Sequence, residues 1–273
     1  MKLARFGPAG EERPAIVDTD GQLRDASSVI TDIDVAAIER LRGVDPASLP
    51  LVSPGERLGV PLTGIGKFIA IGLNYRDHAA ETGMAIPDEP IVFSKAITCL
   101  GGPNDDVPLP RGSEHSDWEI ELGVVIGHKA RYVTEAEALD HVAGYVLVND
   151  LSERRDQKQR GGTWDKGKGH DGFGPVGPWL VTRDEIGDGS GLAMELAVNG
   201  AVKQAGNTDD MIFGVAELVS YVSQFFTLLP GDLIATGTPA GVGDGRKPPE
   251  FLKQGDVIDL AIPGLGRQRQ RIV

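Results

Sequence analysis

The stretch Ser116-Asp117-Trp118-Glu119-Ile120-Glu121-Leu122-Gly123-Val124-Val125-Ile126-Gly127 decides the fold of this chain. Its alternating and then continuous apolar residues predict a β-strand, whose successive side chains point to opposite faces. Glu119 and Glu121 then share one face, about 7 Å apart along the backbone, close enough to converge on one cation. The same alternation also fits a half-buried strand with a solvated face, so other segments have to decide between the two readings.

A second predicted strand, Gly144 to Asp150, ends in a third carboxylate. Four successive apolar residues indicate a central strand, and Asp150 stands at its carboxyl end. Asp150 can complete a three-carboxylate site with Glu119 and Glu121. Three protein oxygens with open positions suit Mg²⁺ or Mn²⁺ better than Zn²⁺, which prefers His and Cys ligands.

A histidine and a glutamate follow an apolar strand predicted over residues 67–74. The next residues are expected to form a helical turn that Gly83 closes, which places His78 and Glu81 on one face. A carboxylate bound to one imidazole nitrogen raises the basicity of the other, as a water-activating base requires. The alternative is a solvated ion pair on a surface helix.

Two glycine-rich segments offer groups for binding an anion. Residues 161–175 contain too many glycines for helix or strand, and they present Lys166 and Lys168 beside the predicted metal site. No P-loop pattern occurs there. The strand that begins at Asp232 leads into a loop around Thr238, where backbone N–H groups and hydroxyls can bind a carboxylate.

The other predicted elements frame these segments. Residues 1–65 form a small leading unit with short strands and a helix over 30–41, and residues 66–273 form the main domain. Lys95, at the end of a predicted strand, is either structural or a substrate contact. Later elements are a hairpin at Asn199-Gly200, a helix from about Asp209 with a buried Val/Leu/Phe stripe that includes Phe225 and Phe226, and a last strand over 256–262 before a basic tail.

Composition limits the kinds of partner and compartment. The 273 residues are 40% hydrophobic, enough for a sizeable core, and the formal net charge of -13 argues against nucleic-acid binding. The single cysteine, Cys99, cannot form an internal disulfide, and the first residues lack the apolar core of a secretory signal. No window is long enough to span a bilayer. We expect a cytoplasmic protein that binds neither nucleic acid nor membrane.

Five ordered motifs over residues 67–273 together resemble the fumarylacetoacetate hydrolase family. They are Gly72-Leu-Asn-Tyr-x-x-His78-x-x-Glu81, Glu119-x-Glu121-Leu-Gly-Val-Val-Ile-Gly, Asn149-Asp150-x-Ser-x-Arg154-x-x-Gln157, Lys168-x-x-x-x-x-Gly174-Pro175 and Pro230-Gly-Asp-Leu-Ile-x-Thr-Gly-Thr238-Pro-x-Gly-Val-Gly243. The Gly161–Gly169 loop most resembles the branch that acts on 2,4-diketo-3-deoxy sugar acids.

The resemblance implies a mixed α/β fold, mainly β, with a β-roll core domain and a small N-terminal α+β domain. It implies a homodimer or higher homo-oligomer and a divalent metal, Mg²⁺ or Mn²⁺, on Glu119, Glu121 and Asp150. It further implies that His78 and Glu81 form a water-activating dyad on a lid. Arg154, Gln157 and Lys168 would stabilise an oxyanion, with Lys168 counted among the catalytic residues, and Thr238 would hold a carboxylate.

The resulting prediction is a metal-dependent hydrolase that cleaves the C3–C4 bond of a 2,4-diketo acid, an acylpyruvate or a diketo-deoxy sugar acid such as diketo-deoxyrhamnonate or diketo-deoxyfuconate, to pyruvate and a second acid. Three alternatives stay open. An oxaloacetate-type decarboxylase needs the same chelation but no attacking water. Ureidoglycolate lyase uses a similar motif set. An inactive protein that only binds a metal or sugar acid would show no turnover.

Overall fold

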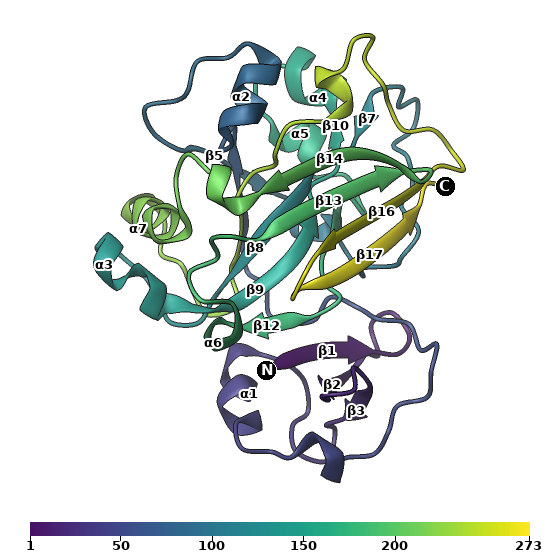
Figure 1. The fold of residues 1–273 in the computed structure, drawn as a ribbon, viewed down its shortest axis with the longest axis vertical. Coiled ribbons are helices and arrows are strands. Elements are labelled where there is room, and N and C mark those ends of the chain that lie inside the picture. Colours follow the sequence, from purple (N-terminus) through teal and green to yellow (C-terminus); the bar gives the residue numbers. More distant parts are fainter.

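A nine-stranded mixed sheet forms the centre of the computed structural model, which describes residues 1–273 (Figure 1). All neighbouring strands of this sheet are antiparallel except one parallel pair, β15 and β4. In spatial order the strands are β3 (Leu23–Asp25), β2 (Arg13–Val17), β1 (Lys2–Phe6), β12 (Leu180–Thr182), β9 (Val142–Asn149), β8 (Ile120–Ile126), β15 (Leu233–Ala235), β4 (Phe68–Gly72) and β5 (Ile91–Lys95).

A four-stranded antiparallel sheet lies over β8 and β9 (Figure 1). Two buried glutamines link the layers, because Gln204 Oε1 accepts from the Ile120 N–H at 3.0 Å and Gln268 Nε2 donates to the Leu147 carbonyl at 2.8 Å. Apolar side chains of both sheets fill one large core between them. Its strands, in spatial order, are β14 (Ala201–Asn207), β13 (Ala193–Val198), β16 (Val257–Ile262) and β17 (Gly266–Arg271).

Short strand pairs and short helices surround the sheets. The helices are α1 (Val35–Leu41), α2 (Arg76–Thr82), α3 (Glu135–Ala138), α4 (Arg154–Gln159), α5 (Asp165–Lys168), α6 (Arg183–Ile186) and α7 (Val215–Phe225), with 3₁₀ turns at 46–48, 97–99, 139–141, 208–210 and 243–245. The pairs are β6 (Leu100–Gly101) with β11 (Gly174–Pro175) and β7 (Ser116–Asp117) with β10 (Ser152–Glu153). None of the helices combines the length and apolar character needed to cross a membrane.

Local sequence signals explain several of these boundaries. Asn199 and Gly200 have φ angles of 51° and 78°, as a two-residue hairpin requires, and they join β13 to β14 as predicted. Gly83 ends α2 in the left-handed conformation, also as predicted. The predicted mixed α/β class, with strands dominant, is confirmed.

The N-terminal unit continues the main sheet instead of standing apart from it. Strand β1 pairs with β12, so β1, β2 and β3 extend the nine-stranded sheet at its lower edge in Figure 1. Helix α1 begins at Val35 and not at residue 30, because the Asp34 side chain accepts from the Ala37 N–H and caps the helix there. The division at residues 65/66 stays a prediction.

Three other local predictions were wrong. The helix expected from Asp209 begins at Val215, and its predicted core residues Phe225 and Phe226 are 56% and 43% exposed because the helix ends there. The basic tail is strand β17, whose buried residues are two glutamines, so charged and neutral polar residues alternate along it. Part of the glycine-rich segment forms the single turn α5.

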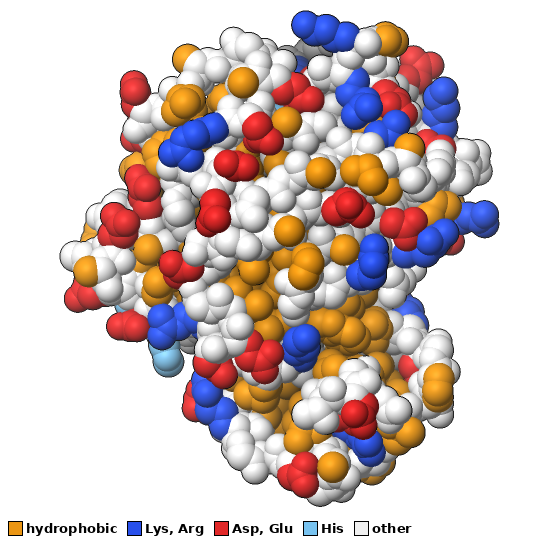
Figure 2. All heavy atoms as spheres, in the orientation of Figure 1, with side chains coloured by type: hydrophobic (Ala, Val, Ile, Leu, Met, Phe, Trp, Pro, Cys, Tyr) orange, Lys and Arg blue, Asp and Glu red, His pale blue; other side chains and the backbone are white.

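The surface over the four-stranded sheet carries both signs of charge. Figure 2 shows acidic and basic side chains interspersed across this face, with hydrophobic side chains exposed between the sheet and the N-terminal unit. Charged side chains of neither sign gather in one patch on this face.

Candidate metal centre and active site

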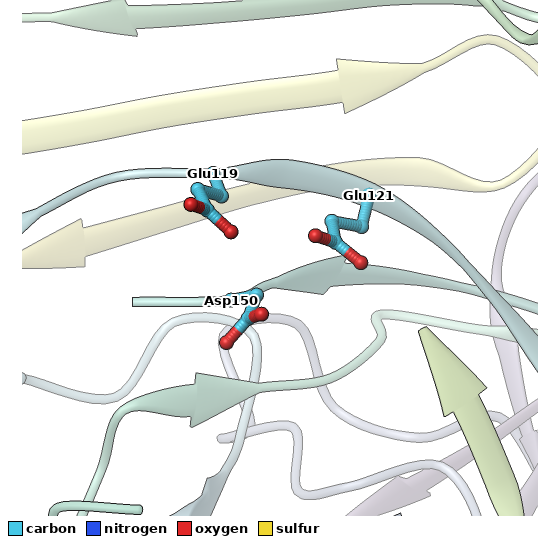
Figure 3. A group of neighbouring side chains, drawn as sticks. All are labelled: Glu119, Glu121 and Asp150. Carbon is cyan, nitrogen blue, oxygen red and sulfur yellow. The ribbon is translucent and has the colours of Figure 1, made fainter. Parts of the chain in front are cut away.

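Three buried carboxylates meet beside the end of strand β9. Glu119 precedes β8, Glu121 lies on it, and Asp150 follows β9. Their oxygens lie within 4.8 Å of one another, and Figure 3 shows the three side chains turned toward a common point. The structure thus brings together the three residues that the sequence offered as metal ligands.

Strand pairing produces this convergence. In the β8–β9 ladder, Ile120 lies opposite Asn149, and the Asp150 N–H donates to the Glu119 carbonyl at 2.8 Å. This register places Asp150 next to Glu119, although Asn149, the residue before Asp150, lies 30 residues after Glu119 in the sequence. A one-residue shift of the pairing would turn these side chains away from each other.

Two buried lysines share the carboxylates. Lys168 Nζ lies 2.6 Å from Glu119 Oε2 and 2.7 Å from Asp150 Oδ2, and Lys95 Nζ lies 2.5 Å from Asp150 Oδ1. Lys95 also donates to the Lys168 carbonyl. The Lys95 side chain, which the sequence left undecided, therefore holds both Asp150 and the α5 turn in place.

The three carboxyl groups have different electrostatic environments. Burial raises the pKa of Glu119, but Lys168 and Arg154 outweigh burial and hold that pKa below its usual value. Burial, with the negative charges of Asp150 and Glu119, raises the pKa of Glu121 well above its usual value. Glu121 accepts one hydrogen bond, from the Gly237 N–H at 2.8 Å, and forms no ion pair.

This donor set fits a divalent cation. The site offers carboxylate oxygens only, which are the ligands that Mg²⁺ and Mn²⁺ prefer. A bound cation would compensate the charge of Glu121, which forms no ion pair with a lysine or arginine. The assignment of the three residues as ligands stays a prediction, supported by this geometry.

Arg154 and Gln157 lie on the first turn of α4 and face the carboxylates. Arg154 Nη1 donates to Gln157 Oε1 at 3.1 Å, and Arg154 Nε donates to Asp117 Oδ2 at 2.8 Å. Arg154 Nη2 lies 2.7 Å from Glu119 Oε1 in an ion pair, but its angles form no hydrogen bond. The N–H bonds of Nη2 thus make no well-aligned hydrogen bond within the protein, although Glu119 lies beside them.

The predicted dyad lies on α2. His78 Nδ1 lies 3.2 Å from Glu81 Oε2, and the two Glu81 oxygens accept from the Gly241 N–H at 3.0 and 3.1 Å. Burial raises the pKa of Glu81, but the hydrogen bonds from His78 and Gly241 overcome it and lower that pKa below its usual value. An ionised Glu81 accepts Nδ1–H of the ring and leaves Nε2 as the basic nitrogen.

A cavity of about 80 Å³ connects these groups. Its walls include His78, Glu119, Glu121, Arg154, Gln157, Lys168 and Thr238, together with Trp164. The Trp164 ring packs against the Gly72 backbone, where a Cβ atom would lie 2.3 Å from the ring. A larger cavity of about 640 Å³ lies beside α1, and none of the predicted site residues lines it.

Thr238 is less free than the sequence suggested. Its hydroxyl donates to the Ile120 carbonyl at 2.8 Å and accepts from Gln204 Nε2 at 2.8 Å. A substrate carboxylate therefore competes with Ile120 for the hydroxyl proton. Lys166 is outside the site, because its Nζ donates to the Arg160 carbonyl at the surface.

Sequence reasoning missed Asp117, a fully buried carboxylate beside the site. It accepts hydrogen bonds from Arg154 and from the backbone of residues 243 and 244. The available signal was the alternation of acids at 117, 119 and 121 in the stretch that opens β8.

Comparisons with known proteins agree with this architecture. Residues 67–273 match the family described as fumarylacetoacetate (FAA) hydrolase, C-terminal. The chain is 59% identical over 273 residues to 2,4-didehydro-3-deoxy-L-rhamnonate hydrolase of a Sphingomonas species, covering all of this chain and 96% of that relative.

Solved structures show the same fold. The fumarylacetoacetate hydrolase of psychrophilic Exiguobacterium antarcticum is 35% identical, with a TM-score of 0.89, and the match covers 100% of this chain and 99% of that one. Maleylpyruvate hydrolase of a Sphingobium species is 30% identical, with a TM-score of 0.82 and the same coverage. The predicted fold is therefore confirmed over the whole chain, and not only over the residues that carry the matching motifs.

Proposed function

Since this chain belongs to the fumarylacetoacetate hydrolase family and is an enzyme that hydrolyses a carbon–carbon bond, we propose that its substrate is a 2,4-diketo-3-deoxy sugar acid. The favoured compound is 2,4-didehydro-3-deoxy-L-rhamnonate, because 59% identity over the whole chain relates this protein to a hydrolase of that compound. Cleavage of C3–C4 would release pyruvate from C1–C3. The remaining carbons, with the C5 hydroxyl and C6 methyl, would leave as lactate.

The carboxylate cluster supports a metal-dependent reaction. A divalent ion held by Glu119, Glu121 and Asp150 would act as a Lewis acid toward the carboxylate and 2-keto oxygens of the substrate and stabilise the enolate charge. The protein's part is to hold these three acids close together and buried. We propose Mg²⁺ or Mn²⁺ as the ion, because the donors are all oxygen.

His78 and Glu81 supply the proposed general base. Glu81 holds Nδ1 of the ring, so Nε2 can take a proton from water as the water attacks the C4 carbonyl. When the C3–C4 bond breaks, its electron pair moves into the enolate of pyruvate. The same proton can then be returned to C3, which restores the neutral imidazole.

Arg154, Gln157 and Lys168 are the proposed donors to the C4 oxyanion. All three side chains are buried and line the cavity with the carboxylates. A donor fixed in a water-poor site stabilises a developing oxyanion, and loss of one such donor costs about 100- to 1,000-fold in rate. Burial lowers the pKa of Lys168, but Asp150 and Glu119 outweigh it and raise that pKa, which keeps the ammonium charged.

The cavity must widen to admit this substrate. Its volume of about 80 Å³ is far below the roughly 300–1,000 Å³ of ligand pockets. One wall is α2, fastened to the 240–241 backbone by Asp77 at 3.2 Å and by Glu81 at 3.0 Å. We propose that these contacts form the closed state of a lid.

The experiment that tests the function is product analysis in ¹⁸O-labelled water with Mg²⁺. Purified protein should convert the diketo-deoxyrhamnonate to pyruvate and to lactate that carries one ¹⁸O in its carboxylate. Unlabelled products, or carbon dioxide in place of lactate, would instead indicate the decarboxylase alternative. Acetopyruvate and a panel of diketo-deoxy sugar acids would define the range of substrates.

We further propose a cytoplasmic homodimer. Cys99, a buried cysteine without a disulfide partner, fits a reducing compartment and supports this proposal. The dimer follows from the family resemblance, and light scattering after gel filtration would test it. A monomeric mass would contradict that part of the proposal and leave the proposed reaction unaffected.

A further inference from the structure

Asp117 is a buried carboxylate that lines no part of the catalytic cavity but contacts two of its walls. It is fully inaccessible and lies on β7, two residues before Glu119. Its two oxygens accept four hydrogen bonds. The donors are the N–H of Trp118 at 2.8 Å, the N–H of Gly243 at 2.7 Å, the N–H of Asp244 at 3.0 Å and Nε of Arg154 at 2.8 Å.

The first wall is the guanidinium of Arg154. Asp117 accepts a hydrogen bond from Nε and Gln157 accepts one from Nη1, so two contacts fix the plane of the guanidinium. The remaining nitrogen, Nη2, is buried and lies 2.7 Å from Glu119 Oε1 in an ion pair without a well-aligned hydrogen bond, and it belongs to a side chain that lines the cavity. Because its N–H bonds are not aligned on Glu119, Nη2 can still donate to an oxygen of a bound ligand.

The second wall is the loop that holds the dyad. Gly243 packs so tightly that a Cβ atom would lie 1.9 Å from the Glu250 carbonyl oxygen and 2.8 Å from Asp117 Oδ1. Two residues earlier, the Gly241 N–H holds Glu81. Asp117 therefore links the Arg154 side of the cavity to the His78–Glu81 side.

We propose that Asp117 is a positioning residue that fixes Arg154 so that Nη2 meets the oxyanion or a carboxylate oxygen of the substrate, and this rests on the proposed function. Asp117 acts through Arg154 and touches neither substrate nor metal. Removing the charge of Asp117 alters a residue that supports a substrate-binding side chain without touching the substrate. Such changes typically lower activity about 10- to 100-fold.

The decisive variant is Asp117→Asn. The amide keeps the shape but places an N–H donor against either Arg154 Nε or the loop N–H groups, all of which are donors themselves. We expect kcat for pyruvate release to fall about 10- to 100-fold, while the calorimetric affinity for Mn²⁺ stays that of the parent. A parental kcat would overturn the proposal.

Asp232→Asn is the matched control. Asp232 is 1% exposed and accepts from Lys67 Nζ at 2.5 Å and from the N–H groups of Lys67 and Leu229, and it does not line the catalytic cavity. It therefore reproduces the burial and the backbone bonds of Asp117. We expect a similar loss of thermal stability with kcat unchanged, and an equal loss of kcat in both variants would reduce Asp117 to a structural role.

A double-mutant cycle separates positioning from independent effects. If Asp117 acts through Arg154, Arg154→Ala and the double variant Asp117→Asn/Arg154→Ala should have the same kcat. If the kcat loss of the double variant were instead the product of the losses in the two single variants, the proposal would be contradicted. A wild-type protein that releases no pyruvate from any diketo acid would instead contradict the proposed function.

Arg154→Lys keeps the proposal testable if Asp117→Asn does not fold. Lysine keeps the charge but cannot bind Asp117 and present a second nitrogen to the cavity at once. We expect kcat to fall as far as in Arg154→Ala. Wild-type turnover in Arg154→Lys would overturn the idea that a fixed orientation is needed.

Discussion

Lys168 Nζ lies 2.6 Å from Glu119 Oε2, so one lysine from the glycine-rich segment reaches into the carboxylate cluster at β8. The contact anchors the α5 turn, and with it Trp164 at the cavity wall. The residue expected to bind substrate therefore also binds a candidate metal ligand. A metal bound at the proposed site would share the oxygens of Glu119 and Asp150 with Lys168, so the effect of each on the other can be measured.

Lys168→Met should separate metal binding from turnover. The change removes a cation that shares Glu119 and Asp150, so Mn²⁺ should bind at least as tightly as to the parent. Turnover should fall about 100- to 1,000-fold if Lys168 stabilises the oxyanion. Calorimetric titration with Mn²⁺ and a coupled pyruvate assay measure the two effects. The control is Lys166→Met on the same turn, because Lys166 Nζ hydrogen-bonds to the Arg160 carbonyl and not to the carboxylates. Weaker Mn²⁺ binding in Lys168→Met would contradict a site that metal and lysine share.

Glu121→Gln should remove metal affinity without destabilising the metal-free fold. Glu121 has no cationic partner, so neutralising it leaves no charge unpaired. We expect Mn²⁺ affinity to fall by more than the roughly 10- to 100-fold typical of outer contacts, with an unchanged or higher melting temperature in chelator. Glu195→Gln, at an exposed position on β13, serves as control. If Glu121→Gln bound Mn²⁺ as tightly as the parent, Glu121 would not be a metal ligand.

Asp150→Ala should behave differently, because it leaves Lys95 and Lys168 without their shared carboxylate. Breaking a buried ion pair from one side costs about 3–5 kcal/mol in free energy of unfolding. Urea denaturation of metal-free protein should therefore rank Asp150→Ala well below Glu121→Gln. Equal stabilities would show that the lysines find other partners.

His78→Ala should bind metal and an oxalate inhibitor as the parent does but lose hydrolysis. The side chain contacts Glu81 and none of the three clustered carboxylates, so its removal leaves the metal site intact. A general base contributes about 100- to 10,000-fold to rate, and pyruvate release should fall by that factor. Oxalate-dependent protection against heat provides the control for binding. Undiminished pyruvate release would place the base elsewhere.

Glu81→Gln should change the pH dependence of stability. Because the folded-state pKa of Glu81 is lowered from the usual 4.5, its pairing stabilises the fold fully above pH 4.5 and less as pH falls through the lowered pKa. The parent should thus exceed Glu81→Gln by less than about 1 kcal/mol at neutral pH, since the pair is partly exposed.

That difference in free energy of unfolding should shrink below pH 4.5. Urea denaturation at several pH values measures it, and Glu11→Gln, at an exposed position, serves as the control variant. A difference that grows on acidification would mean that the sign of the Glu81 shift is wrong.

Local patterns in the sequence determined the class of fold and most of its elements. The alternation before Gly123 predicted the strand that carries Glu121 and begins one residue after Glu119, and Asn199-Gly200 predicted a hairpin, because each depends on neighbours a few residues away. The family resemblance is confirmed for the same reason, since its motifs are short and ordered. The exposure of Phe225 and Phe226 escaped prediction because both continue the apolar spacing of α7 although they stand at its end and are not covered by the core.

Only the tertiary structure decided which side chains far apart in the sequence contact each other in the site. Pairing of β8 with β9 brings Asp150 to Glu119, and Lys168 reaches Glu119 from 49 residues away, contacts that no local pattern contains. The same holds for Asp117, three of whose four hydrogen-bond donors lie 37 to 127 residues further along the chain. Side-chain periodicity follows from the backbone at each residue, whereas charge compensation in a buried site depends on which distant chains the folded core brings within a few ångströms.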